Sequence, residues 1–330
     1  EEHMRITENM MTSTYNRNLQ RNISDLASSN LKLSSKRQYN HVSEDPATAS
    51  KAFAIRDQIA RSEEHISVVK NARGELDTAD SNIVTLNSIL ETVYEKATKA
   101  GGASSQDSMD AIAEELGGLK EEILQTMNAK YGDKFLFSGS SNSEAPFTVD
   151  GDGNLLFNGK PVDAYDKNDP DTYFDENKPV YLDIGFGTYA SGTNTAKTGI
   201  KISTSGVDVL GYGKDENGLP NNLYSLIGKV EEQLRGGDKE GAMDTLSQLK
   251  KKQSNISIAT SELGTREKLL DRTEDRLETG LINLQKSQTD LESVKIETEA
   301  INNKSCETAW MITLQLGSSI IPPSIFDFMK

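Results

Sequence analysis

The first run of residues that could do chemistry is Asp150-Gly151-Asp152-Gly153-Asn154, which opens like a calcium-binding loop. Such a loop needs glycine at its sixth position for a sharp turn and glutamate at its twelfth to supply two oxygens. Those positions are held by Leu155 and Pro161. The run therefore predicts the turn of a β-hairpin, where Gly and Asp are favoured, and no metal or other cofactor is expected.

A second run matches the dinucleotide fingerprint letter by letter: Gly185-Phe186-Gly187-Thr188-Tyr189-Ala190. It follows a strand-like segment, but the fingerprint must also open a helix whose N-terminus binds the phosphates. Here the chain continues into Ser191-Gly192-Thr193-Asn194, which is typical of a loop. Nucleotide binding is therefore not expected.

Catalytic groups are sparse. His41 and His65 lack the spacing of metal ligands and are predicted to be exposed to solvent. The one cysteine, Cys306, allows no disulfide within the chain and is predicted to pack in a helix. Adjacent glutamates lie in helical stretches near Lys or Arg, which indicates solvated faces: Glu63-Glu64, Glu114-Glu115, Glu121-Glu122 and Glu231-Glu232. We expect no enzyme activity.

Composition excludes further classes. The chain has 330 residues, 26% charged and 35% hydrophobic, which is ordinary for long exposed helices with narrow apolar seams. Its net charge of −15 argues against a nucleic-acid partner, because phosphates need clustered Lys and Arg. No run reaches the ~18 apolar residues of a membrane helix, and no signal-peptide pattern is present. Composition alone would predict a cytosolic protein. Residues 1–3 are interpreted as a remnant of expression.

Helical periodicity marks both ends of the chain. In the first helix, apolar residues recur mostly at steps of three, four or seven, which places them on one face: Met11, Tyr15, Leu19, Ile23, Leu26 and Leu33. Residues 34–44 are polar and predict a loop. A second helix should begin at Asp45-Pro46, since Asp caps orphan N–H groups and Pro suits the first helical position.

This second helix has the 3,4 spacing of a coiled-coil seam from Leu76 to Ala100. It would span roughly 80 Å at 1.5 Å per residue, although Gly74 makes a break possible. Another helix covers Ile112 to Met127. Short apolar runs at 135–137, 155–157, 180–184 and 199–202, separated by turn residues, then predict strands.

Helix returns after Pro220, and a long final helix is predicted from about Lys239. Seven apolar residues recur in it at every seventh position: Leu249, Ile256, Leu263, Leu270, Leu277, Leu284 and Leu291. Burying one leucine contributes about 1.5–3 kcal/mol, whereas ordering one residue costs about 1–2 kcal/mol. One seam cannot hold such a helix, so the final helix must pack on the earlier ones.

The two chain ends have one apolar stripe each and no core of their own. They could pair with each other, but such a pair would expose an outer apolar face. We therefore expect the ends to be weakly ordered in a lone chain and to fold when other subunits cover them.

Four tracts resemble one known family. Residues 4–11 resemble the opening of hook-filament junction proteins (flagellar hook-associated protein 3), which are in the flagellin-like family. Flagellins open similarly but usually have Asn where Thr7 stands. Residues 33–37 and 43–49 resemble the family's Leu-Ser-(Ser/Thr)-Gly-Lys…Ser-Asp-Asp-Pro tract, without the Gly and with Glu44 for Asp. Residues 131–140 are similar to its Gly-x-Tyr-Leu-Phe-(Ser/Ala)-Gly tract, and residues 323–329 to its Pro-Ser-Leu-x-Asp-Phe-Leu ending. Residues 141–220 carry no resemblance.

The resemblance implies a fold that is mainly α, a long coiled-coil-like helical bundle formed by both chain ends with a central β-rich inserted domain. It implies an inner domain from 4–40 and 296–330, a helical domain from 41–140 and 221–295, and an outer β-rich domain at 141–220. It also implies an extracellular place in the bacterial flagellum, export through the flagellar secretion apparatus without a cleaved signal peptide, and an export chaperone that binds the C-terminus.

We therefore expect a structural adaptor that forms a ring between hook and filament, with a neighbouring hook-associated protein and flagellin as partners. Two alternatives stay open: a flagellin filament subunit, and a secreted adhesin whose insert at 141–220 binds a ligand. The predicted assembly interface comprises Met11, Tyr15, Leu19, Leu26, Leu33, Leu284, Leu291, Ile301, Ile312, Leu316 and Ile320. The same residues could instead form an ordinary core within one chain.

Overall fold

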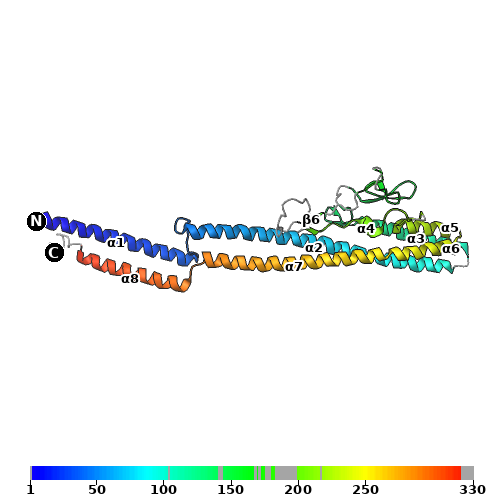
Figure 1. Cartoon of the computed structure of the whole chain (residues 1–330). Helices are drawn as coiled ribbons and strands as arrows, with labels where there is room; N and C mark the ends of the chain where they lie inside the picture. The colour runs from blue at the N-terminus through cyan, green and yellow to red at the C-terminus, as the bar shows by residue number, and fades with distance from the viewer. Residues whose placement is uncertain are drawn as a thin grey trace. The chain divides into compact units, whose positions relative to one another are not determined.

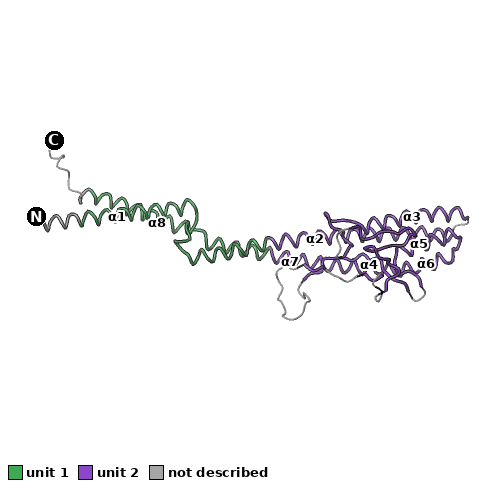
Figure 2. The backbone as a smooth tube through the Cα atoms, turned by 90° about the horizontal axis from the view of Figure 1, so that it is seen from above, with its two compact units in different colours: residues 1–63, 278–330 green, residues 64–277 purple. Residues whose placement is uncertain are grey.

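The computed structural model describes residues 2–102, 105–139, 144–166, 169, 172–174, 180–182, 199–215 and 218–320, with side chains from residue 10 to residue 317 of these ranges. The fold is mainly α, with long helices from both chain ends and small β-sheets in a central insert, which confirms the predicted fold class (Figure 1). The chain forms two compact units, residues 1–63 with 278–330 and residues 64–277 (Figure 2).

The first unit holds helix α1 (Glu2–Ser35) and helix α8 (Ile296–Ile320), which lie side by side. The connectors that leave these two helices are joined by backbone hydrogen bonds. The N–H of Gln38 donates to the carbonyl of Glu292 at 2.8 Å, and that of Val294 donates to the carbonyl of Lys36 at 3.1 Å. The predicted polar loop after α1 is thus part of a joint that ties the two ends of the chain together.

Helix α2 (Pro46–Gly101) begins where the sequence predicted. The Asp45 carboxylate accepts a hydrogen bond from the N–H of Thr48 at 3.0 Å, and the Thr48 side chain and backbone lower the pKa of Asp45. The helix continues unbroken through Gly74, where a Cβ would clash with the Tyr131 hydroxyl. The glycine therefore allows a close approach of the 130–135 hairpin, which is also held by an ion pair of 2.5 Å between Lys134 and Glu75.

The prediction of one long final helix from about Lys239 is wrong. The structure has three helices there: α6 (Lys239–Lys252), α7 (Ser254–Glu292) and α8. Gln253 leaves the helix and donates its amide to Asn87 of α2 at 2.8 Å. At the second break the backbone of Glu292 is bonded to the connector after α1. A tertiary contact lies at each interruption, and no Gly or Pro marks either one.

The row of leucines nevertheless packs as the spacing predicted. Leu249, Ile256, Leu263, Leu270 and Leu277 are all less than 7% exposed. They continue as one seam across the break at Gln253. The seam covers the apolar face of α2, whose buried residues in the second unit are Ile66, Val69, Ala72, Leu76, Ala79, Ile83, Leu86, Ile89, Leu90, Val93, Ala97 and Ala100.

Helix α3 (Gln106–Met127) and helix α5 (Leu223–Arg235) pack against each other in the second unit, and α5 packs on α6. A short helix, α4 (Gly206–Leu210), lies in the insert and precedes α5 in the chain. The side chain of Asn128, just after α3, makes two hydrogen bonds with the backbone of Phe147, of 2.8 and 3.0 Å. These bonds anchor the insert to the end of the helix.

Short antiparallel strands lie in the 130–135 hairpin and in the insert: β1 (Lys130–Tyr131) with β2 (Lys134–Phe135), β3 (Phe147–Val149) with β4 (Leu155–Phe157) and β5 (Lys160–Pro161), and β6 (Tyr181–Leu182) with β7 (Ile200–Lys201). The predicted runs overlap β2, β4, β6 and β7, whereas β1, β3 and β5 were not predicted. The calcium-like run is the β3–β4 turn, as predicted. The Asp150 carboxylate there accepts the Asn154 N–H at 2.8 Å, and hydrogen bonds from Asn154 lower the pKa of Asp150. The fingerprint at 185–190 lies outside the described residues.

Carboxylates gather on one side of the seam between α2 and α7 in the second unit. Arg73 makes ion pairs with Asp271 at 3.1 Å and Glu274 at 3.4 Å. Asp80 and Glu267 lie in the same cluster, and each has a buried oxygen with no hydrogen-bond partner in the described part of the chain. Burial, followed by the charge of Asp77, raises the pKa of Asp80. Burial and the charge of Asp80 raise that of Glu267.

We predict that Asp80→Asn raises the melting temperature at pH 7. Because the pKa of Asp80 is raised by folding, the folded chain binds this proton more tightly than the unfolded chain does, and stability falls as pH rises through the folded-state pKa. The neutral amide removes that loss. The gain should vanish below about pH 3.9, where the aspartate is protonated in both states. Thermal unfolding from pH 3 to pH 8 measures it, with Asp275→Asn on the exposed face of α7 as the control. An equal gain for both variants at every pH would contradict the assignment.

Candidate functional site

Polar side chains form hydrogen bonds between α1 and α8. The Asn22 amide donates to the Thr313 hydroxyl at 2.6 Å. Two turns further on, the Ser29 hydroxyl donates to the Glu299 carboxylate at 2.6 Å. The Asn303 amide donates to the side-chain oxygen of Asn30 at 2.8 Å. These hydrogen bonds join the two helices without burying many apolar side chains.

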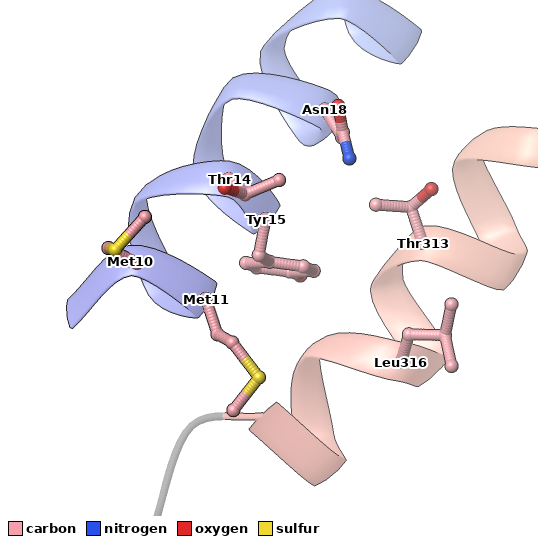
Figure 3. A pocket seen from close by; sticks show the side chains of 7 residues that line it. All are labelled: Met10, Met11, Thr14, Tyr15, Asn18, Thr313 and Leu316. Atoms are coloured by element: carbon pink, nitrogen blue, oxygen red, sulfur yellow. The ribbon is translucent and has the colours of Figure 1, made fainter. Parts of the chain in front are cut away.

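Tyr15 is the exception in this seam. It is 8% exposed, and its ring lies between the two helices (Figure 3). Gly317 of α8 has no side chain there, and a Cβ at that position would clash with the Tyr15 hydroxyl. The glycine thus makes room for the aromatic ring in the last part of the helix pair.

Burial differs sharply between this pair and the rest of the chain. Tyr15 is the one large apolar side chain below 9% exposure in α1 and α8, among the residues whose side chains are described. Helix α2, by comparison, buries Ala49 and Ala52 in the first unit and a full row beyond them in the second. A helix in water draws most of its stability from the packing of its apolar face. The α1/α8 pair therefore lacks the core that would normally stabilise helices of this length.

Many large apolar side chains of α1 and α8 are exposed instead. The described residues include twenty exposed large hydrophobic side chains, and ten of these lie on the two helices. They are Met10, Met11, Ile23, Leu31, Ile296, Ile301, Met311, Ile312, Leu314 and Leu316. We name this set the outer apolar surface. Single exposed apolar residues are normal on a protein surface, but a concentration of this kind marks an interaction site.

One face of α8 shows the pattern most clearly. Ile301 is 74% exposed and Ile312 is 52% exposed. With Ser305 and Thr308 they are spaced by four, three and four residues, which places them on one side of the helix. Together with Lys304 and Ala309 they line an open groove of about 590 Å³. Among the residues whose side chains are described, none of α1 lines it, so this face is accessible to another chain.

The predicted interface residues fall into three groups. Tyr15 is buried, whereas Leu19, Leu26, Leu33, Leu284 and Leu291 are half-buried. Met11, Ile301, Ile312 and Leu316 are exposed. The side chain of Ile320 lies outside the described residues. The structure therefore brings Tyr15 together with Met11 and Leu316 at one groove, and leaves Ile301 and Ile312 on a separate face of α8.

Sequence reasoning missed several members of the outer apolar surface. Met10, Leu31, Ile296, Met311 and Leu314 were not predicted as interface residues, and Ile23 was placed in the stripe but not in the interface. The signal was present, because α8 carries apolar residues on more sides than one stripe needs. The polar seam with α1 was the missing information, since hydrogen-bonded pairs leave no periodic pattern.

The joint next to the pair is held by charge. Arg56 of α2 makes an ion pair of 2.8 Å with Glu292 at the end of α7, and its hydrogen bond lowers the pKa of Glu292. Phe53 lies under the Arg56 guanidinium, 5.7 Å from it, and is 53% exposed. His41 is exposed as predicted, but His65 is half-buried because it adjoins the buried face of α2 at Ile66.

Among the described residues, no group of three or more His, Cys, Asp or Glu side chains has a geometry that could hold a metal ion. Within the described part of the chain, no helix is long and apolar enough to cross a membrane. What the arrangement of α1 and α8 can do is bind other protein surfaces through apolar contact.

Comparison with known proteins confirms the predicted resemblance. Residues 6–142 match the family model for the bacterial flagellin N-terminal helical region. Flagellar hook-associated protein 3 of Salmonella typhimurium is 24% identical over 117 residues, which are 35% of this chain and 37% of that relative. The matched stretch thus spans little more than a third of the relative's length.

Two solved structures share the fold. FlgL of Bacillus cereus is similar with a TM-score of 0.53 and 18% identity, over 72% of this chain and 99% of that one. Flagellar hook associated protein-3 of Legionella pneumophila is similar with a TM-score of 0.55 and 13% identity, over 72% of this chain and 98% of that one. The likeness therefore extends over both units and beyond the region that the family model covers.

We predict that Gly317→Ala destabilises the α1/α8 pair. Replacing an open helical glycine by alanine normally stabilises a helix by about 0.5–1 kcal/mol, but the new methyl group would push Tyr15 out of the seam at about 1–3 kcal/mol. Gly280→Ala on α7 is the matched control, since nothing lies within 4 Å of its Cβ position. Hydrogen exchange at residues 10–20 and 311–317 should quicken in the first variant alone. Unchanged exchange in both would show that Tyr15 does not hold the seam.

Proposed function

We propose that this chain is a structural subunit of the bacterial flagellum, an adaptor that joins hook to filament. The observation that carries the proposal is the outer apolar surface: ten large hydrophobic side chains exposed on a helix pair whose own seam is polar. Likeness in sequence and fold to hook-associated protein 3 and FlgL supports it.

The mechanism is assembly coupled to folding. An α1/α8 pair that buries one large apolar side chain gains little stability from its own packing. Each apolar side chain that becomes fully covered by a neighbouring subunit contributes about 1.5–3 kcal/mol. Covering half of the outer apolar surface would therefore supply more free energy than the lone pair has in its own seam, and the subunit would become rigid as it joins the assembly.

We also propose the domain organisation and the partners that the family resemblance implies. Residues 4–40 and 296–330 form the inner domain, 41–140 and 221–295 the helical domain, and 141–220 the outer β-rich domain. Copies of the chain form a ring, with a neighbouring hook-associated protein on one side and flagellin on the other. The subunit leaves the cell through the flagellar export apparatus, where a chaperone binds its C-terminal end. The helix pair is made of the two ends, so both must be exported before it can form.

We predict that the double substitution Ile301→Lys and Ile312→Lys abolishes assembly but leaves the lone subunit folded. Both side chains are more than half exposed, so each change should alter the free energy of unfolding by less than about 0.5 kcal/mol. Two buried lysines at a subunit contact would, however, be strongly unfavourable. Pull-down of the purified subunit on flagellin filament fragments measures assembly, and circular dichroism checks the fold.

The matched control is Ile258→Lys, which changes a side chain of 65% exposure on α7 in the second unit. It should bind like the unaltered chain. If the double variant also bound normally, the outer apolar surface would not be the assembly interface. If the unaltered chain grew long filaments by itself, it would be a flagellin rather than an adaptor.

A further inference from the structure

Methionines are distributed unevenly between the two units of the molecule. The chain has eight, and six of them have described side chains. The three that are most exposed all lie on the α1/α8 pair: Met10 is 65% exposed, Met11 55% and Met311 47%. Figure 3 shows the Met10 side chain on the side of α1 that faces away from α8. All three belong to the outer apolar surface.

The other three described methionines lie in the second unit and are covered to a greater degree. Met109 and Met127 of α3 are 5% and 1% exposed. Met243 of α6 is half-buried, and its sulfur lies beside Gly101 at the end of α2. Small solutes therefore reach the methionine sulfurs of the outer apolar surface more easily than those of the second unit.

The sulfur of an exposed methionine can be oxidised by a peroxide. The sulfur attacks one oxygen of hydrogen peroxide, the O–O bond breaks as the S–O bond forms, and the second oxygen leaves with both protons as water. The sulfur loses two electrons, and the peroxide gains them. The product is methionine sulfoxide, which is polar where the thioether was apolar, and reductases return it to the thioether.

This change of polarity bears directly on the outer apolar surface. A neighbouring subunit gains free energy by covering these side chains because they are apolar. A sulfoxide oxygen accepts hydrogen bonds from water and would lose them in an apolar contact, which is unfavourable unless a donor takes the place of the water. In the lone subunit the same oxygen stays in water, so oxidation should leave the fold of the second unit unchanged.

We propose that Met10, Met11 and Met311 are an oxidation site through which hydrogen peroxide reversibly blocks assembly of the free subunit. The proposal rests on the proposed function, since it needs the outer apolar surface to be the assembly interface. It does not need an ordered helix pair in the lone subunit, because loosening of α1 and α8 exposes the three sulfurs further. A neighbouring subunit that covers them also shields them, so oxidation acts before assembly.

The first measurement follows oxidation of the lone full chain by hydrogen peroxide, with mass spectrometry of its peptides. A Cys306→Ala background removes the cysteine, which peroxide also oxidises. The three exposed methionines should form sulfoxide at least about 10-fold faster than Met109 and Met127, since a buried sulfur reacts only when its surroundings open. Equal rates at all five positions would overturn the proposal.

The second measurement compares association before and after peroxide treatment, by pull-down on flagellin filament fragments. Peroxide should weaken binding in the Cys306→Ala background at least about 10-fold, and methionine sulfoxide reductase should restore it. A triple variant keeps apolar side chains of similar volume but has no sulfur at the site: Met10→Leu, Met11→Leu and Met311→Leu. It should bind equally well before and after peroxide, whereas the matched control Met243→Leu should stay sensitive.

A peroxide-treated chain that still binds would overturn the proposal and leave the proposed function standing. Loss of binding in the triple variant would overturn it too, because the damage would then lie elsewhere, for example at Met4 or Met329, which every variant retains. Loss that the reductase does not reverse would also contradict it. If the untreated chain did not bind at all, the proposed function would fail and the proposal with it, so the two failures are distinguishable.

Discussion

A long helix in water must bury its apolar face against something, and the whole structure depends on how each helix meets that requirement. Helix α2 meets it within the chain, because the leucine row of α6 and α7 covers its seam and leaves residues such as Leu76 and Leu86 fully buried. Helices α1 and α8 do not. Their shared seam is made by polar pairs such as Asn22 with Thr313, so most of their apolar side chains still face water.

This difference distinguishes two parts of the molecule. The second unit covers its apolar faces within the chain, whereas the α1/α8 pair of the first unit does not. In the second unit, α3, α5 and α6 add a packed core, and the insert is fixed to it by the hydrogen bonds between Asn128 and Phe147. In the first unit, backbone bonds at Gln38 and Val294 and the ion pair of Arg56 with Glu292 hold the joint next to the helix pair. The pair itself has an exposed apolar surface that another protein can cover.

Local signals in the sequence predicted most of the fold. Asp45-Pro46 marked the start of α2, the seven-residue spacing marked the seam of α6 and α7, and short apolar runs marked β2, β4, β6 and β7. The break at Gln253 could not be predicted, because it depends on a hydrogen bond to Asn87, far away along the chain. The sequence also indicated that pairing of the two ends would leave an apolar face outside. It named Ile301, Ile312 and Leu316 of α8 as interface residues, and all three are exposed. It did not name Ile296, Met311 and Leu314, because the hydrogen-bonded pairs between α1 and α8 leave no periodic pattern in the sequence.

Deletion of the gene in the flagellated bacterium that carries it tests the central claim most directly. Electron microscopy would then be combined with a blot for flagellin in the medium. The adaptor function predicts hooks without filaments, with flagellin monomers released into the medium, and restoration of filaments by the unaltered gene. Normal filaments on the deletion strain would contradict it. Bare hooks with no flagellin in the medium would also contradict it and would identify the chain as the filament subunit.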